Sequence, residues 1–348
     1  MTILFIDTVH PILEQRLTTL GFTCVDGTSL SYQEAVEAEK TAHGIVIRSR
    51  FPMDANFLQH GRHLKFIARS GAGMENIDEA YCKQHNIQLF NAPEGNSNAV
   101  AEHALGMLLS LCNNFHRGNE EVRQGIWDRE GNRGEEVDGK TIGIIGYGNN
   151  GSAFAKKLRG FDAKVLVYDK YKTNISNDFI TQVALDELYA QSDVISFHIP
   201  QNQETLYWAN AAFFDAVRKP IYLLNLSRGK IVDTQALLDA LESGKVKGAG
   251  LDVLEFEKAS FEQFEAQGNQ LFLNLVKHPK VLLTPHVGGW TKESYFKLSD
   301  VLADKICKWF DGLKQGTFWR EWILRIIFSK LVPYSTLIFF ISLHYFFF

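Results

Sequence analysis

Short apolar runs alternate with amphipathic segments in the first part of the chain. The apolar runs predict strands at 3–6, 23–25, 44–50, 64–73 and 87–91, the fourth of which runs into a glycine-bearing loop. Helices are expected at 11–20, with Pro11 in the first turn, and after the capping box formed by Ser31 and Glu34. This alternation of strand and helix predicts a small α/β domain that binds ligands in the loops after its strands.

A second block of apolar runs begins after a long helix. Turn residues from Pro93 lead into a mainly apolar helix from about Ala99, and a polar, glycine-bearing stretch follows at 125–139. A helix that is apolar on most sides is expected to lie between two bodies, so this one is predicted to cross into a second domain. Further strands are predicted at 142–145, 165–168, 193–200, 221–229, 248–257 and 280–290. Such apolar runs are typical of parallel strands buried on both faces, and they predict a doubly wound sheet.

The end of the chain differs from the rest. An amphipathic helix is predicted from Thr291 to about Leu313, packed back towards the first domain. Beyond Thr317 the sequence is rich in Phe, Ile and Leu, and 331–348 contains no Asp, Glu, Lys or Arg, which approaches the length of a membrane span. A tail anchor, an apolar arm buried in a partner subunit, and non-native sequence from read-through or a frame slip are the three interpretations. The last is favoured because the composition is unlike everything before it.

Composition sets the class of protein and excludes several functions. A chain of 348 residues with 45% hydrophobic residues is long enough for two globular domains. A net charge of -4 without a basic run argues against nucleic-acid binding. The four cysteines are scattered, so no zinc or other metal site and no redox motif is predicted. The chain starts without a basic segment before its first apolar run, which indicates no secretory signal and makes the cytoplasm the expected location.

A glycine motif follows the first strand of the second block. The sequence places Gly146, Gly148 and Gly151 in the spacing G-x-G-x-x-G between a strand and a helix, with Asn149 and Asn150 inside the loop. In a dinucleotide site these glycines permit a tight turn, close approach to the pyrophosphate, and close packing of helix on strand. Asp169 ends the next strand, where a carboxylate accepts hydrogen bonds from ribose hydroxyls and disfavours a 2′-phosphate. The motif therefore predicts an NAD site.

Four features after strand ends carry candidate chemistry. They are Arg228, Glu257, His286 and the loop 70–73. A guanidinium binds carboxylate and carbonyl oxygens as a fork, and a histidine transfers a proton near neutral pH. A carboxylate beside the histidine orients its ring, and a glycine loop offers backbone N–H groups to an anion. Together they predict hydride chemistry at a hydroxyl next to a carboxylate, with His198 as the rival acid/base.

These motifs resemble the D-isomer-specific 2-hydroxyacid dehydrogenases. The resemblance runs from Ile3 to about Leu313 through RSGAGMENID, NAPEGNSNAVAEHA, GIIGYGNNGSAFAKKL, DVISFHIP, NLSRGKIVD, GLDVLEFE and LTPHVGG, in the family's order. It implies a Rossmann NAD-binding domain, 99–290, inserted into a flavodoxin-like substrate domain made of 1–98 and 291–316, with 317–348 as an anomalous tail. It also implies a homodimer formed through the cofactor domain, and a 2-hydroxy acid or 2-oxo acid substrate such as 3-phosphoglycerate or glycerate/hydroxypyruvate.

The resemblance also implies roles for individual residues. The catalytic residues would be Arg228, Glu257 and His286. The cofactor would contact Gly146, Gly148, Asn149, Asn150, Gly151, Asp169, His198, Pro200, Ser227, Asp252 and Gly288. The substrate would contact Arg48, Ser70, Gly71, Ala72, Gly73 and Asn96.

Some residues leave alternatives open. Arg48 and Arg69 either stabilise strand ends or receive a distal phosphate, and Trp127 is interpreted as core or interface. His103 is interpreted as structural. Trp290 stands where phosphoglycerate-type members carry a small residue, and its indole could narrow the substrate end of the cleft. A non-catalytic, NAD-sensing corepressor on the same fold is the alternative function.

Overall fold

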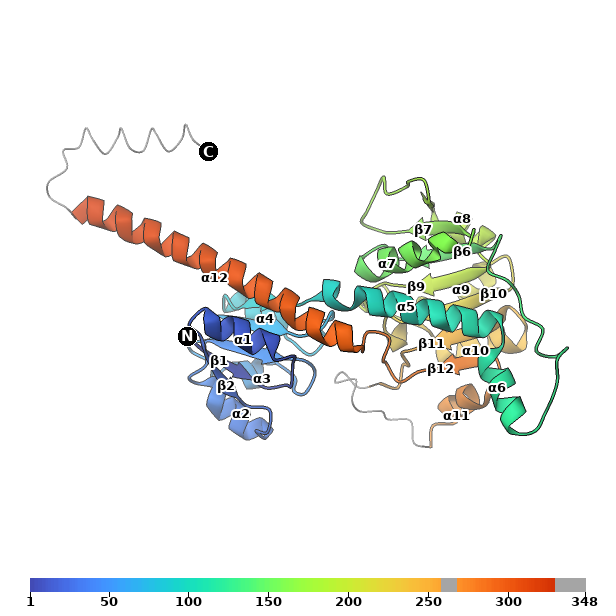
Figure 1. The fold of residues 1–348 in the computed structure, drawn as a ribbon, viewed down its shortest axis with the longest axis horizontal. Coiled ribbons are helices and arrows are strands. Elements are labelled where there is room, and N and C mark those ends of the chain that lie inside the picture. Colours follow the sequence, from blue (N-terminus) through green and yellow to red (C-terminus); the bar gives the residue numbers. More distant parts are fainter. Residues whose placement is uncertain (258–267, 329–348) are drawn as a thin grey trace. The chain divides into compact units, whose positions relative to one another are not determined.

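Five parallel strands form the first sheet, in the spatial order β2-β1-β3-β4-β5. Figure 1 shows this part of the chain in blue, with β1 and β2 labelled. The computed structural model describes residues 1–257 and 268–328. The strands are β1 (Thr2–Phe5), β2 (Thr23–Asp26), β3 (Gly44–Ile47), β4 (Phe66–Arg69) and β5 (Gln88–Phe90), and the helices are α1 (Ile12–Thr19), α2 (Tyr32–Glu39), α3 (Ala55–Leu58) and α4 (Glu79–Gln84). The order 2-1-3-4-5 is that of flavodoxin-like sheets. All five strands predicted for this part are present.

Three helices, α2, α3 and α4, begin after a side chain that caps their first turn. Ser31 and Glu34 form the predicted capping box, with each backbone N–H donating to the other's side chain. Asp54 accepts from the Phe57 N–H and Asp78 from the Tyr81 N–H in the same way. These bonds satisfy N–H groups that the first helical turn leaves unpaired.

Seven parallel strands form the second sheet, in the order β12-β11-β10-β9-β6-β7-β8. They are β6 (Thr141–Ile145), β7 (Lys164–Tyr168), β8 (Ile180–Gln182), β9 (Val194–Phe197), β10 (Ile221–Asn225), β11 (Val246–Leu251) and β12 (Val281–Leu283). Read from β8 to β11, this is the 3-2-1-4-5-6 order of the Rossmann fold with one further strand at the edge. The order reverses between β6 and β9, which places a ligand-binding crevice at their carboxyl ends.

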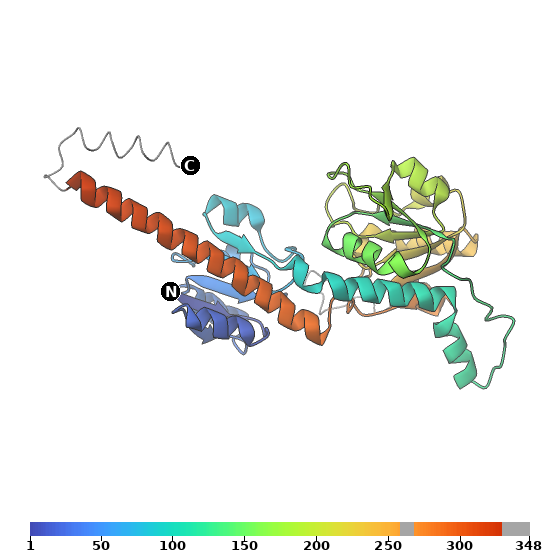
Figure 2. The same cartoon turned by 45° about the horizontal axis from the view of Figure 1, so that its top comes forward.

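Helices cover both faces of the second sheet, as Figure 2 also shows. They are α5 (Pro93–Cys112), α7 (Asn149–Lys157), α8 (Leu185–Gln191), α9 (Ala211–Ala216), α10 (Thr234–Glu242) and α11 (Gln270–Lys277), with short 3-10 turns at Leu158–Gly160 and Gly229–Ile231. α5 packs against α7 on one face, where Met107, Leu108 and Phe154 are buried. The opposite face is covered mainly by α8, α9 and α10. The central strands β6, β9, β10 and β11 are consequently buried on both sides, as their apolar runs predict.

The crossover helix differs from its prediction in two ways. α5 begins at Pro93 instead of about Ala99, because proline suits the first helical turn. Gly95 in this part of the helix lets the backbone of Leu298 approach. A Cβ at Gly95 would lie only 2.7 Å from the Cα of Leu298. The predicted helix also breaks at Asn114, which has a φ of 53°, and α6 (Phe115–Arg123) follows as a separate helix. The structure also contains α3, α4, β8, α8, α9 and α11, for which no element was predicted.

The last described element is α12 (Lys292–Phe328). The predicted helix ended near Leu313, so the helix is longer than expected. Its first turns contact the first sheet's helix α1: Arg16 forms an ion pair of 2.6 Å with Asp300, and the His10 N–H donates to Ser299 Oγ at 3.1 Å. No helix within the described ranges has the length and apolar character of a membrane span. The charge-free part of the tail, 331–348, lies outside the described residues.

Candidate functional site

The glycine loop after β6 has the shape that a phosphate group needs. Gly146 has a φ of 93°, and a Cβ there would lie 2.5 Å from the His198 carbonyl oxygen, so glycine is required at this turn. A Cβ at Gly151 would lie 2.0 Å from the Gly146 oxygen, which explains the third glycine. Gly148 stands before α7, and a Cβ there would contact nothing within 4 Å. The backbone at Gly148 and the start of α7 are thus accessible to a pyrophosphate, and the loop fits NAD.

Asp169 fastens this loop to the end of β7. Its Oδ2 accepts from the Tyr147 N–H at 2.7 Å, and its Oδ1 accepts from the Tyr171 and Lys172 N–H groups, both at 2.9 Å. Burial works to raise the pKa of this carboxyl, but the three backbone hydrogen bonds outweigh it and hold the pKa below its usual value. Asp169 is therefore charged at the position where the ribose of a dinucleotide is expected.

One cavity of about 430 Å³ brings most of the other predicted residues together. Its lining includes all six predicted substrate residues, namely Arg48, Ser70, Gly71, Ala72, Gly73 and Asn96. Two of the predicted catalytic residues, Arg228 and His286, line it as well, as do Asn150 and Asp252. Residues from the loops after β3, β4, β10 and β12 meet here, so strand ends that are distant in sequence converge on one space.

His286, which lines this cavity, forms a short contact with Glu257. The His286 Nδ1 lies 2.6 Å from Glu257 Oε2, and the two side chains are 25% and 13% exposed. Glu257 is fixed in turn because its Oε1 accepts from the Leu254 N–H at 2.5 Å. A carboxylate on one ring nitrogen fixes the tautomer and leaves proton transfer to the other nitrogen.

Asp252 holds the loop that carries His286. Its carboxylate accepts from Thr284 Oγ1 at 2.6 Å, from the Val287 N–H at 2.9 Å and from the Gly288 N–H at 2.8 Å. The His103 ring contacts the same turn through Thr284 at 3.0 Å. The contact of His103 with Thr284 agrees with the interpretation of His103 as structural. Asp252 both lines the cavity and holds the loop of His286 in place by hydrogen bonds.

Glu75 is a site residue that the sequence did not single out. Its Oε1 lies 2.6 Å from Nε of Arg228, with side chains 28% and 19% exposed respectively. Burial opposes ionisation of Glu75, but the charge and hydrogen bond of Arg228 outweigh it and lower the pKa of the carboxyl. Its position in RSGAGMENID, two residues after the glycine loop, was the available signal. A carboxylate in a loop of the first sheet thus orients the arginine that follows β10.

His198 is a poor candidate for the acid/base. Its Nε2 lies 2.8 Å from Ser196 Oγ, its ring packs near Phe154, and burial lowers its pKa to about 4. A histidine in this state is neutral at pH 7 and a weak base. Two other predicted cofactor residues lie at strand ends: Ser227 donates its hydroxyl to Asn225 Oδ1 at 2.8 Å, and the Pro200 carbonyl accepts from Thr205 Oγ1 at 2.7 Å.

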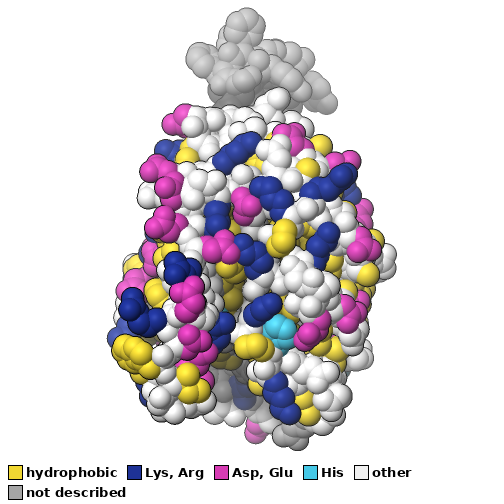
Figure 3. All heavy atoms as spheres, turned by 90° about the vertical axis from the view of Figure 1, so that its right-hand side faces the viewer, with side chains coloured by type: hydrophobic (Ala, Val, Ile, Leu, Met, Phe, Trp, Pro, Cys, Tyr) yellow, Lys and Arg dark blue, Asp and Glu magenta, His cyan; other side chains and the backbone are white. Residues whose placement is uncertain are grey.

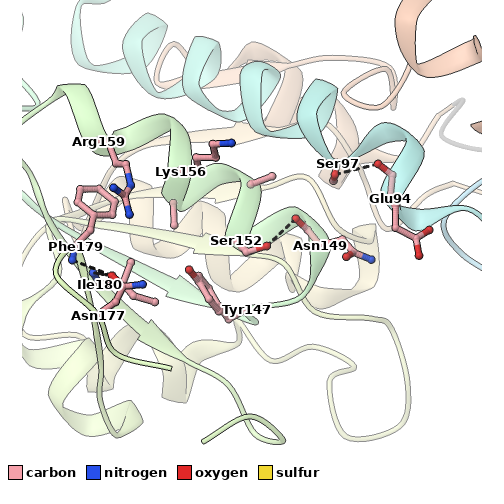
Figure 4. Close-up of a pocket in the computed structure, with 12 residues that line it drawn as sticks. Glu94, Ser97, Tyr147, Asn149, Ser152, Lys156, Arg159, Asn177, Phe179 and Ile180 are labelled. Carbon is pink, nitrogen blue, oxygen red and sulfur yellow. Dashed lines mark hydrogen bonds between the residues drawn. The ribbon is translucent and has the colours of Figure 1, made fainter. Parts of the chain in front are cut away.

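A second cavity of about 520 Å³ lies along α7 and contains none of the predicted catalytic residues (Figure 4). Asn149, Tyr147, Lys156 and Arg159 line it, on the side of α7 that faces Phe179. The face shown in Figure 3 carries acidic and basic side chains interspersed, without a field of one sign. No cluster of metal ligands occurs among the described residues. Trp127, interpreted as core or interface, is 79% exposed in this single chain.

The comparisons with known proteins agree with this geometry. The family model described as "D-isomer specific 2-hydroxyacid dehydrogenase, NAD binding domain" matches residues 105–288. D-3-phosphoglycerate dehydrogenase of Archaeoglobus fulgidus is 33% identical over 87% of this chain and 57% of its own length. Hydroxypyruvate reductase of Thermotoga maritima is 33% identical over 76% of this chain and 83% of its own. This chain therefore spans little more than half the length of the first of these relatives.

Solved structures give the same result. D-lactate dehydrogenase from Aquifex aeolicus, complexed with NAD and lactic acid, superposes with a TM-score of 0.75 at 29% identity, covering 90% of this chain and 97% of that one. The flavodoxin-like and Rossmann sheets, the glycine loop and the family match are consistent with one another. The chain belongs to the D-isomer specific 2-hydroxyacid dehydrogenase family, and residues 105–288 are its NAD-binding domain.

Proposed function

We propose that this protein is an NAD-dependent oxidoreductase that transfers a hydride between NAD(H) and a D-2-hydroxy acid or the matching 2-oxo acid. The observation that carries the proposal is the 2.6 Å contact of His286 with Glu257 at a cavity that Arg228 also lines. An acid/base, a carboxylate that orients it and a guanidinium are the groups needed to interconvert a hydroxyl and a carbonyl beside a carboxylate. The names of the relatives, dehydrogenases and a reductase, support this reaction class.

The residues have the following roles in this proposal. NAD, when bound, supplies the hydride acceptor, and the backbone at Gly148 and the start of α7 holds its pyrophosphate. In the oxidation direction, His286 removes the hydroxyl proton, and Glu257 supports the protonated ring. Arg228 polarises the substrate oxygen and holds the carboxylate, to which the loop 70–73 adds backbone N–H donors. In the reduction direction the protonated His286 returns the proton to the carbonyl oxygen.

A panel of 2-oxo acids tests the function. NADH oxidation is measured with glyoxylate, hydroxypyruvate, pyruvate and 3-phosphohydroxypyruvate, which share the reacting group and differ in the rest of the molecule. Turnover of at least one of them above the blank is expected, with 3-phosphohydroxypyruvate and hydroxypyruvate as the favoured members. NADH binding without turnover of any 2-oxo acid would contradict the proposal and favour the non-catalytic, NAD-sensing alternative.

Asp169→Ala is expected to relax the preference for NADH over NADPH, because removal of the carboxylate removes its repulsion of a 2′-phosphate. The same change also frees the three N–H groups that Asp169 binds, which would weaken both cofactors. Asp169→Asn is the matched control, since an amide oxygen still accepts hydrogen bonds but carries no charge. The measurement is the ratio of kcat/KM for NADH and NADPH in each variant. An unchanged ratio in both would argue against the ribose role.

The domain division and the assembly belong to the same proposal. Residues 1–98 with 291–316 would form the substrate domain and 99–290 the cofactor domain, with the tail outside both. A homodimer through the cofactor domain is supported by the apolar side chains that α6 and the next residues expose, among them Phe115 at 60% and Val122 at 54%. A protein that light scattering shows to be monomeric would count against the dimer.

A further inference from the structure

Trp290 and Arg48 both line the cavity that contains His286. Arg48 follows strand β3 of the first sheet. Trp290 follows the loop of His286, and its N–H donates to the Val287 carbonyl at 2.8 Å, so a tight turn aims the residue. The indole is 49% exposed, although it packs edge to face with Tyr295 at 5.9 Å between ring centroids. The exposed part of the indole leaves apolar surface at the cavity that a bound ligand can cover.

The guanidinium of Arg48 lies over this indole. Its Cζ is 4.1 Å from the ring centroid, well within the range of a cation–π contact. The backbone below it is held at both ends: the Arg48 N–H donates to Asp7 Oδ2 at 2.6 Å, and its carbonyl accepts from Arg69 Nε at 2.9 Å. Arg48 is therefore fixed at its main chain by hydrogen bonds and at its head group by stacking.

Arg48 differs from the two other arginines near these strand ends. Arg50 donates to the backbone carbonyls of its neighbours, such as Thr28 and Leu30, and so ties loops together. Arg69 is buried and donates to Asn76 and Gly73, which shapes the glycine loop. Within 1–257 and 268–328, no carboxylate forms an ion pair with Arg48. Arg48 thus lines the cavity without an acidic partner from the described protein.

A stacked guanidinium is a prepared anion site. Its flat face is covered by the ring, so its hydration is reduced and its plane is fixed, while the N–H groups along its edge stay available for a carboxylate or phosphate fork. Arg228 in the same cavity is assigned to the substrate carboxylate in the proposed function. A second prepared cation in that cavity fits a substrate with a second anionic group.

We propose that Trp290 is a positioning residue of the substrate site: by stacking on Arg48 it selects 2-oxo acids that carry a second anionic group beyond the reacting carbon. This inference rests on the proposed function and names the substrate class of that site. A phosphate ester and a second carboxylate offer the same fork of oxygens to a guanidinium. The experiment therefore uses substrates of both kinds, so that the phosphate ester and the second carboxylate are compared directly.

The test compares matched substrates in matched variants. The discrimination ratio is kcat/KM for 3-phosphohydroxypyruvate divided by kcat/KM for hydroxypyruvate, which lacks only the phosphate. We expect Trp290→Leu to lower this ratio by about tenfold, the size of a lost cation–π contact intermediate between exposed and desolvated, whereas Trp290→Phe retains most of it. Arg48→Gln is expected to lower it further. A dicarboxylate, 2-oxoglutarate, in place of the phosphate ester shows which anion the site prefers.

Two comparisons separate this role from a structural one. Because Trp290 acts through Arg48, the double variant Trp290→Leu, Arg48→Gln should lose no more discrimination than Arg48→Gln alone. Arg62→Gln, which removes an exposed charge from the same part of the chain, controls for net charge and should leave the ratio as in the wild type. Equal losses of kcat/KM for both substrates with Trp290→Leu, or additive losses in the double variant, would overturn the inference.

A binding measurement covers the case in which the proposed function fails. If the wild type reduces none of the 2-oxo acids, the reaction assignment is wrong, and calorimetry of 3-phosphoglycerate and glycerate with the NAD-loaded protein then tests the subsite by itself. Tighter binding of the phosphorylated ligand, lost in Arg48→Gln and weakened in Trp290→Leu, supports the inference without turnover. Equal affinities of the two ligands in the wild type would refute it.

Discussion

Replacing His286 by glutamine is expected to lower kcat by about 10²-fold to 10⁴-fold with each 2-oxo acid that the wild type reduces, which is the usual contribution of a positioned acid/base. Glutamine has a similar reach and can still donate a hydrogen bond to Glu257, which lies 2.6 Å from the histidine ring. It cannot carry a proton to or from the substrate. The measurement is the steady-state rate of NADH oxidation, with the NADH affinity determined separately so that a cofactor defect is not mistaken for a chemical one.

Three further substitutions make the result specific. Glu257→Gln removes the charge that supports the protonated ring and should produce a smaller loss of kcat than His286→Gln. His85→Gln makes the same chemical change at the residue that follows α4, where the ring stacks on Tyr81, and controls for the substitution itself. If His286→Gln keeps near-normal turnover while His198→Gln loses it, the roles of the two histidines were assigned the wrong way round.

The parallel β/α character of both sheets and the convergence of the site could be foreseen because both follow from local patterns. Apolar runs of strand length, each followed by helical sequence, specify parallel β/α units, and parallel strands bring their carboxyl ends to one edge. Residues separated by long stretches of chain, such as Arg228 and His286, were therefore expected to be neighbours, and both line one cavity.

The features that the sequence did not predict depend on contacts between segments that are far apart in the chain. The backbone of Leu298 approaches Gly95 in the first turns of α5, a contact between segments far apart in sequence that no local pattern records. The pairing of Glu75 with Arg228 joins a loop of the first sheet to one of the second, and no periodicity in either segment records it. The cation–π contact of Arg48 with Trp290 is of the same kind. The sequence drew attention to Trp290 by its size, but not to the partner that explains it.

The burial of Glu39 is another feature that the sequence did not predict. Glu39 is the last residue of α2, where sequence would place an acid in water, yet it is 0% exposed. Neither of its carboxylate oxygens has a hydrogen-bond partner within the described part of the chain. A Cβ at Gly61 would lie 2.5 Å from Oε1, so the neighbouring loop leaves little space around the group. Burial raises the pKa of Glu39 from 4.5 to about 8.

This raised pKa fixes the sign of a stability effect. Between pH 4.5 and 8 the folded protein keeps a proton on Glu39 that the unfolded chain has lost, so the free energy of unfolding falls as the pH rises. The contribution is fully present below pH 4.5 and has gone once the pH exceeds about 8. At about 1.4 kcal/mol per pKa unit, the whole change is on the order of 5 kcal/mol. That is a large part of the stability of a typical domain.

Glu39→Met is accordingly expected to remove this pH dependence and to stabilise the protein at pH 8 by a few kcal/mol, because methionine fills similar space without a charge to bury. The measurement is urea unfolding, followed by circular dichroism, from pH 5 to pH 9 in the wild type and the variant. Glu37→Met is the matched control: its carboxylate lies two residues away, is 69% exposed and pairs with Lys40, so its curve should keep the wild-type slope. If the curves of the wild type and Glu39→Met stay parallel over this range, Glu39 is not a buried neutral acid, and α2 must end in contact with water.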